Sequence, residues 1–247
     1  MNLFYYILAL LSIMAGAFVL FHLSVILILI IFALPVSTKK TYDKPSPLYH
    51  NLFNFAYWYL IFSSRTRVHV TGLEKIPQDE NFMFISNHRS KFDNMIHSYC
   101  MKKYNLSFIS KKENFNIPIG KHYMARNCYL SLDRNNIRQG AEVIATAINY
   151  IKEGITNIGV FPEGTRSNDL QVHEFHAGTF KIAVRANCPI VVGVIQGTEN
   201  IHKYFPLRKS DVYFDIVEVI KPEDFSGMNT IQIAERCQKI VEKNLKK

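Results

Sequence analysis

A histidine and an aspartate stand five positions apart directly after an apolar stretch, in the segment FISNHRSKFD. Phe84 and Ile85 are typical of the end of a buried strand, and polar residues, including His88, follow at once. In one regular helix, His88 and Asp93 would lie about 140° apart around the axis, because each residue advances by about 100°. The two side chains can therefore meet only if His88 lies in the turn after the strand and Asp93 lies in the first turn of a helix.

Such a pair could perform acid–base chemistry. The Asp93 carboxylate would accept a hydrogen bond from one imidazole nitrogen of His88, which leaves the other nitrogen free to take a proton. Strand-to-helix turns are common positions for active-site residues in α/β proteins. On this segment alone, a hydrogen-bonded histidine with a helix-capping aspartate is the simpler explanation, so the catalytic interpretation needs support elsewhere.

The segment FPEGTRS gives that support. Pro162 ends a predicted strand, and Glu163, Gly164, Thr165 and Arg166 follow within four positions. Glycine permits close approach of the backbone to a ligand, and arginine offers a planar fork for phosphate oxygens. The glutamate could hold that fork or bind a hydroxyl group. A capped turn with a surface ion pair is the alternative.

The rest of the chain alternates between strand-like and helix-like segments. The clearest helix is predicted for residues 135–154, where apolar residues recur at the i, i+3, i+4, i+7 spacing of one buried face. Helices are also predicted for residues 93–103, 177–186 and 229–245, and a loop or helix end for residues 117–120. Strands are predicted for residues 67–71, 82–86, 106–110, 129–132, 157–161, 190–195 and 212–220. This alternation predicts an α/β fold with a mixed, mainly parallel sheet flanked by helices.

The N-terminal stretch 3–34 contains no Asp, Glu, Lys or Arg. As one helix it would be ~48 Å long, whereas the hydrocarbon core of a bilayer is ~30 Å thick. A strongly tilted helix or a break near Gly16 would fit it to the membrane. A cleaved signal peptide is the alternative, but no positive charge precedes the apolar run, which continues past the small residues at 15–17. A retained membrane-embedded helical segment is therefore expected.

The next residues predict how the chain meets the membrane. Lys39, Lys40 and Lys44 follow the apolar stretch, which by the positive-inside tendency places the remainder in the cytoplasm. The aromatic segment 46–64 contains the single Trp58 and predicts an interfacial helix, with an ordinary core helix as the alternative. We therefore expect a hydrophobic membrane anchor over residues 1–38, a juxtamembrane aromatic helix over 39–65 and a cytoplasmic catalytic domain over 66–247.

The formal net charge of +9 indicates partners that carry negative charge. The sequence has no helix-turn-helix, zinc-finger or RNA-recognition pattern, so membrane lipids and phosphate-bearing substrates are favoured over nucleic acid. A basic patch contains Lys203, Arg208 and Lys209. It could contact lipid headgroups or CoA phosphates, or it could have no partner.

No metal site is expected from the sequence. The four cysteines are far apart and form no CxxC motif, so they are interpreted as reduced packing residues. His173 and His176 flank Glu174, but no third ligand is evident, so a surface position is favoured for both histidines.

Together, NHRSKFD and FPEGTRS resemble two motifs of the 1-acyl-glycerol-3-phosphate acyltransferase family, the membrane-bound glycerolipid acyltransferases. Further segments resemble the family in the same order: VHVTGLEKIP its lead-in strand and turn, SKKENFNIPIG and YLSLDRNN its middle motif, and CPIVVGVI its last motif. The resemblance covers roughly residues 68–200. Asn114, where leucine is usual, and Asn127 and Cys128, where apolar or small residues are usual, depart from the pattern and bear on the acyl-chain pocket.

The resemblance implies transfer of an acyl group from acyl-CoA or acyl-carrier protein to a lysophospholipid hydroxyl, above all that of lysophosphatidic acid, without a cofactor. It implies that His88 is the general base and that Asp93 orients its imidazole and stabilises the positive form. Backbone N–H groups around Gly164, or Lys111 or Lys112, would stabilise the oxyanion. The remaining roles concern the acceptor. Its phosphate would be bound by Arg166, Thr165, Arg134 and one of the two lysines. Glu163 would bind its glycerol part or position Arg166.

Other functions stay open at this stage. The acceptor could be glycerol 3-phosphate or another lysophospholipid, or the chain could be a silent lipid-binding protein with this fold. A lipid hydrolase is disfavoured because no G-x-S-x-G nucleophile motif is present. The Lys-, Asn- and Ile-rich composition hints at a bacterial source, and hence at the cytoplasmic face of the inner membrane.

Overall fold

The computed structural model describes residues 3–245 and contains one mixed β-sheet. Within these residues, seven strands lie in the order β1-β7-β6-β2-β5-β3-β4. β6 and β7 run antiparallel, and the other neighbouring pairs are parallel. The bounds are β1 (Thr66–Thr71), β2 (Met83–Ser86), β3 (Leu106–Lys111), β4 (Leu130–Leu132), β5 (Asn157–Val160), β6 (Ile190–Gln196) and β7 (Ser210–Ile220). The predicted mainly parallel sheet is confirmed.

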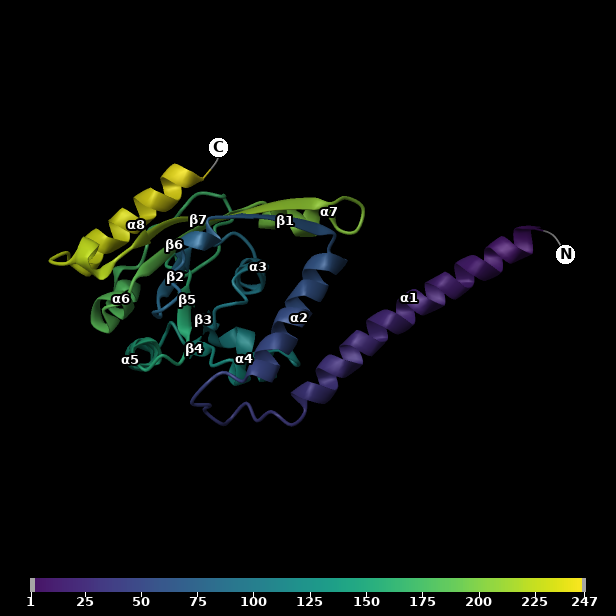
Figure 1. The fold of residues 1–247 in the computed structure, drawn as a ribbon, viewed down its shortest axis with the longest axis horizontal. Helices are drawn as coiled ribbons and strands as arrows, with labels where there is room; N and C mark the ends of the chain where they lie inside the picture. The colour runs from purple at the N-terminus through teal and green to yellow at the C-terminus, as the bar shows by residue number, and fades with distance from the viewer. Residues whose placement is uncertain (1–2, 246–247) are drawn as a thin grey trace.

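Helices cover both faces of this sheet (Figure 1). They are α1 (Leu3–Ala33), α2 (Pro47–Ser63), α3 (Asp93–Cys100), α4 (Gly120–Arg126), α5 (Ile137–Lys152), α6 (Lys181–Ala186), α7 (Ile201–Tyr204) and α8 (Thr230–Asn244). One apolar cluster joins α5, α6 and α8 to the sheet, and two others join α2, α3 and α4 to it. Met83 and Ile85 of β2 belong to the first cluster and Phe84 to the second, which explains why the whole strand is apolar.

The N-terminal residues form one continuous helix without a break at Gly16. α1 is long and apolar enough to cross a membrane, and most of its side chains are exposed. Its second half contacts the rest of the chain: the Tyr123 hydroxyl donates to the Leu29 carbonyl oxygen at 2.9 Å, and the rings of His22 and Tyr59 lie 5.6 Å apart.

α2 has two different faces. Tyr57 and Ile61 are buried against the domain and Tyr59 against α1, whereas Trp58 and Phe62 are exposed and their rings stack 5.5 Å apart. One face of α2 thus packs as in a core helix, and the interfacial position of the aromatic segment stays a prediction. The domain boundary before residue 66 stays a prediction.

One predicted element boundary was wrong, because the helix after the first motif ends at Cys100 rather than at residue 103. Residues 117–119 form the predicted turn after a 3-10 helix (Lys112–Asn116), but α4, which begins at Gly120, was not predicted. With seven residues, α4 is too short for a periodic pattern, and it is held by burial of Tyr123 and Met124. Its tertiary contacts thus decide the structure here.

Candidate active site

The two sequence motifs meet because β2 lies between β5 and β6 in the sheet and runs parallel to both. Parallel strands end at the same edge, so the segments that follow them converge there. His88 follows β2, Glu163 follows β5, and Thr198 follows β6. This edge of the sheet carries the candidate active site.

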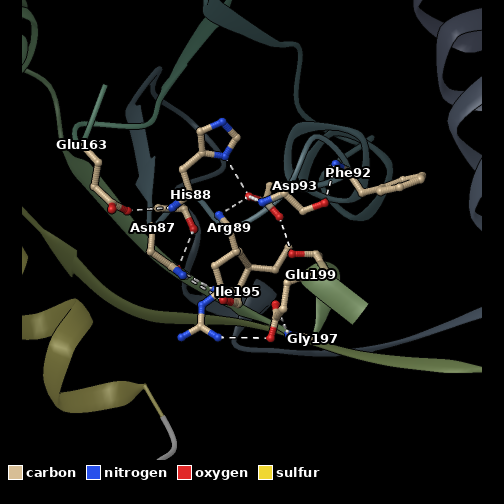
Figure 2. Close-up of polar contacts among 12 residues, drawn as sticks. Asn87, His88, Arg89, Phe92, Asp93, Glu163, Ile195, Gly197 and Glu199 are labelled. Atoms are coloured by element: carbon tan, nitrogen blue, oxygen red, sulfur yellow. Dashed lines mark hydrogen bonds and ion pairs between the residues drawn. The ribbon is translucent and has the colours of Figure 1, made fainter. Parts of the chain in front are cut away.

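His88 and Asp93 adopt the geometry that the sequence required. His88 lies in the turn after β2, Asp93 is the first residue of α3, and the His88 Nδ1 atom lies 2.8 Å from Asp93 Oδ2 (Figure 2). Within residues 3–245 the opposite ring nitrogen, Nε2, has no hydrogen-bond partner. A donor proton on Nδ1 therefore leaves Nε2 as the basic nitrogen that can accept a proton.

The Asp93 carboxylate is fully buried and has four hydrogen-bond donors. Besides His88, the backbone N–H groups of Arg89 and Ser90 donate to Oδ2 at 2.6 and 2.8 Å. The Thr198 hydroxyl donates to Oδ1 at 2.6 Å. These contacts fix the carboxylate, and through it the orientation of the His88 ring.

The backbone and ring of His88 are also held by the second motif. The His88 N–H donates to Glu163 Oε1 at 2.8 Å, and the Ser167 N–H donates to the His88 carbonyl oxygen at 2.8 Å. The imidazole stacks on Phe161 with 4.0 Å between ring centroids and 14° between planes. The FPEGTRS turn thus forms one wall of the histidine site.

Glu163 has a different set of partners from those inferred from the sequence. Its side chain is buried, and its two oxygens accept hydrogen bonds from the backbone N–H groups of His88 and His173. Burial raises the pKa of the Glu163 carboxyl group, and these two amides oppose that effect. Within the described chain Glu163 does not hydrogen-bond to Arg166. Its contacts join the turns after β2 and β5.

The next residues of the turn face solvent. Gly164 adopts a φ of +69°, and Thr165 and Arg166 are exposed. Within the described residues the Thr165 and Arg166 N–H groups have no hydrogen-bond acceptor, whereas the Gly164 N–H donates to Phe161. Burial and then the positive charges of Lys91 and Arg166 lower the pKa of His202. The positive charges of Lys91 and Arg166 therefore lie near His202.

The three other predicted cations lie farther along the same edge, after β3 and β4. Lys112 donates to Asp133 at 2.6 Å, and this partner raises the pKa of Lys112 and lowers that of Asp133. Lys111 and Arg134 are exposed. β5 lies between β2 and β3, and within residues 3–245 none of the three cations hydrogen-bonds to His88.

The sequence did not reveal several residues that support the site. The Asn87 side chain pairs with both the N–H and the carbonyl of Ile195 at 2.9 Å, which joins the ends of β2 and β6. Thr198 also went unnoticed, although its position directly after an apolar strand was a usable signal. His173 and His176, interpreted as plain surface residues, lie beside the turn: His173 donates its N–H to Glu163, and the His176 ring abuts Gly164.

A second histidine lies behind the site. His97 of α3 is fully buried, and neither of its ring nitrogens has a hydrogen-bond partner in the described structure. Its ring contacts Phe84, Phe108, Phe161 and Phe214 at centroid distances of 4.6–6.4 Å. Burial lowers the pKa of His97 to about 3, against the opposing charge of Asp93. His97 is therefore neutral at physiological pH.

The described residues contain no group of three or more His, Cys, Asp or Glu side chains arranged to hold a metal ion. A broad polar groove lies at the opposite edge of the sheet, lined by residues such as Gln78, Asn105 and Asn157. That groove is remote from His88 and carries no part of the site.

The fold and the site define an α/β enzyme with a histidine–aspartate base at the carboxyl edge of a parallel sheet. The acyltransferase family model matches residues 67–196, which include both motifs. The chain therefore belongs to the acyltransferase family of enzymes.

Individual relatives are consistent with this family. The chain is 29% identical over 168 residues to the 1-acyl-sn-glycerol-3-phosphate acyltransferase of Escherichia coli, which covers 67% of each chain. It is 32% identical over 133 residues to an enzyme of the same name, chloroplastic BAT2 of Brassica napus. This aligned region covers 53% of this chain and 38% of that protein. The crystal structure of the 1-acyl-sn-glycerophosphate acyltransferase PlsC from Thermotoga maritima is similar with a TM-score of 0.63, 28% identity and coverage of 79% and 76% of the two chains.

Proposed function

We propose that this chain transfers a fatty acyl group from a thioester, acyl-CoA or acyl-carrier protein, to the free hydroxyl of lysophosphatidic acid. The observation that carries the proposal is the His88–Asp93 pair, whose Nε2 atom has no partner in the described residues and whose backbone is held by the turn that contains Arg166. The relatives from Escherichia coli and Thermotoga maritima are named for the same acceptor. The product would be phosphatidic acid.

The proposed reaction uses His88 twice. His88 Nε2 removes the acceptor's hydroxyl proton as the oxygen attacks the thioester carbonyl carbon. The tetrahedral intermediate then collapses, the carbon–sulfur bond breaks, and the leaving thiolate takes the proton back from His88. Asp93 stabilises the positive imidazolium between these steps. No covalent enzyme intermediate is needed.

Two further parts of the turn have roles in this scheme. The oxyanion needs donors that are not already satisfied, and the Thr165 and Arg166 N–H groups meet that condition. The Arg166 guanidinium would bind the acceptor phosphate, with Lys91 adding charge nearby. Lys111, Lys112 and Arg134 would meet more distant phosphate groups at the same edge.

The location of the enzyme is part of the proposal. The acceptor is a membrane lipid, and α1 would hold the catalytic domain at the bilayer surface, where a donor from the cytoplasm can reach it. The inner membrane of a bacterium, with the domain on its cytoplasmic face, fits this arrangement.

The test compares acceptors at a single enzyme preparation. Detergent-purified protein is supplied with acyl-CoA, or with acyl-carrier protein, and with lysophosphatidic acid, glycerol 3-phosphate, lysophosphatidylcholine or the phosphate-free monoacylglycerol. We expect lysophosphatidic acid to give the highest kcat/KM. Preference for another acceptor with either donor would overturn the proposed substrate.

The role of Arg166 has a matched control in Arg138, an exposed arginine on α5. Arg166→Gln is expected to lower kcat/KM for lysophosphatidic acid by roughly 10–100-fold, the effect of a lost charge-assisted hydrogen bond. The rate with monoacylglycerol should change little, and Arg138→Gln should alter neither rate. Equal losses with both acceptors in Arg166→Gln would contradict phosphate binding by this side chain.

A further inference from the structure

The segment after β6 starts at the active site and ends in a group of exposed apolar and basic side chains. At its start, the Gly197 N–H donates to Glu199, which forms an ion pair with Arg89 at 3.3 Å. The ring of His202 then lies 5.1 Å from Phe92, in the turn between His88 and Asp93. The position of the segment is therefore tied to the mouth of the site.

Residues 203–209, here called the interfacial loop, have an unusual surface composition. Leu207 is 86% exposed and Phe205 is 53% exposed, with Tyr204 beside them. Single exposed apolar residues are common, but an apolar group surrounded by cations is characteristic of surfaces that meet anionic lipid. The flanking cations are Lys203, Arg208 and Lys209.

Contacts from the end of α2 hold the interfacial loop. Arg65 follows that helix with a φ of +55°, a conformation that is costly for a residue with a side chain. Its guanidinium donates to the carbonyl oxygens of Pro206 and Leu207 at 2.9 and 3.4 Å. The Ser210 N–H donates to the Arg65 carbonyl oxygen at 3.3 Å. The strained residue thus fastens both sides of the loop to α2.

The loop is continuous with the other exposed apolar surfaces of the molecule. Phe62, three residues before Arg65, is 63% exposed and stacks on Trp58, and α1 packs beside the same helix through Tyr59. Figure 1 shows α7, the end of α2 and α1 at one side of the molecule, with α8 at the other. The elements that carry these exposed apolar residues therefore lie on the side of the molecule where α1 lies.

We propose that the interfacial loop inserts Phe205 and Leu207 into the surface of an anionic bilayer, while Lys203, Arg208 and Lys209 contact lipid headgroups. The inference rests on the proposed membrane location of the enzyme but not on its acceptor or donor. Such an attachment would press His202 of α7 and the turn that contains Arg166 against the leaflet from which the lipid acceptor comes.

The test uses tryptophan emission in vesicles whose lipids carry brominated acyl chains. The wild-type protein has Trp58 as its single tryptophan and reports whether the protein lies on the bilayer. Leu207→Trp in a Trp58→Phe background reports on the loop. Ile231→Trp in the same background is the matched control, because Ile231 is an exposed apolar residue on α8.

We expect brominated lipid to lower the emission of the tryptophan at 207 about two-fold or more and to leave that at 231 unchanged. The effect should be stronger in phosphatidylcholine vesicles that contain phosphatidylglycerol, and Lys203→Gln/Arg208→Gln/Lys209→Gln should remove this dependence. Quenching of Trp58 without quenching at 207 would overturn the insertion of the interfacial loop but would still support the membrane location of the protein. Absence of quenching at Trp58 and at 207 would overturn both the loop insertion and the membrane location. A loss of activity in the triple variant only with acyl-carrier protein, without quenching at 207, would identify a protein partner instead.

Discussion

At the scale of single residues, Asp93 does two tasks with one carboxylate. One oxygen fixes the His88 imidazole and gathers two backbone N–H groups, and the other accepts from Thr198 on a distant strand end. The carboxylate therefore sets the tautomer of the base and also the shape of the turn that carries it. This double use explains why an aspartate is required at the first position of α3.

Replacement of Asp93 tests this assignment. Asp93→Asn keeps the size of the side chain but removes the charge that stabilises the imidazolium, so kcat is expected to fall by about 10²–10⁴-fold with little change in KM. Thr198→Val removes only one neutral donor to the same carboxylate and should cost much less. Steady-state kinetics of both variants give the comparison. A decrease of only a few-fold in Asp93→Asn would show that His88 does not depend on it.

The buried His97 predicts how stability depends on pH. Its pKa falls from the ordinary value of 6.5 to about 3 on folding, so between these values the unfolded chain binds a proton that the native protein does not. The stabilising contribution of the buried neutral His97 is therefore complete above pH 6.5 and is lost as the pH falls from 6.5 toward 3. The free energy of unfolding should decrease by about 1.4 kcal/mol per pH unit within this window from this group alone.

The variant His97→Phe lacks this titration, and its ring suits the surrounding phenylalanines. The difference in unfolding free energy between the variant and the wild type, measured in detergent at pH 6, 5 and 4, should grow in favour of the variant by the slope given above. A difference that stays constant over this range would show that His97 is protonated in the folded protein.

At the scale of elements, parallel neighbours assemble the site. β2, β5 and β6 bring three turns to one edge, and Asn87, Glu163 and Asp93 then tie these turns together. The turn after β5 is conformationally constrained, because Gly164 has a positive φ and lies against His176.

Two glycines with similar backbone angles separate strain from contact. Gly164 has a φ of +69° and Gly154 a φ of +65°, so alanine should cost each site about 1–2 kcal/mol of stability. A Cβ atom at Gly164 would also lie 2.9 Å from the His176 ring, whereas nothing lies within 4 Å of one at Gly154. Gly164→Ala should therefore reduce kcat/KM at least about ten-fold, and Gly154→Ala should not.

A double variant isolates the steric part. Gly164→Ala/His176→Ala removes the ring that the new methyl group would meet, and activity should recover in part. Equal activity of the two single glycine variants would show that the turn shifts without affecting His88 or Arg166.

The sequence predicted the features that depend on residues close together in the chain and missed those that depend on residues far apart in it. His88 and Asp93 lie within one strand–turn–helix unit, so their spacing was enough to state the one geometry in which they can meet. The contact of Thr198 with Asp93 spans 105 positions and depends on β6 lying beside β2, which no local pattern reveals. The same limit applies to α4, whose seven residues are helical because of their tertiary contacts.

At the scale of the whole molecule, an apolar helix, an aromatic face of α2 and a cationic site edge occur in one chain. The second half of α1 contacts α2 through His22 and Tyr59 and contacts α4 through Leu29 and Tyr123. The net charge of +9 favours anionic substrates and surfaces. In the proposed function, this arrangement brings a lipid hydroxyl and a water-soluble thioester to the same histidine.

The most direct measurement is the release of thiol from the acyl donor by detergent-purified protein, with and without lysophosphatidic acid, in the wild type and in His88→Ala. We predict release that requires the acceptor, forms phosphatidic acid in equal amount, and falls by about 10²–10⁴-fold in the variant. Release that persists unchanged in His88→Ala would contradict the assignment of His88 as the base. Release without any acceptor would indicate hydrolysis rather than acyl transfer.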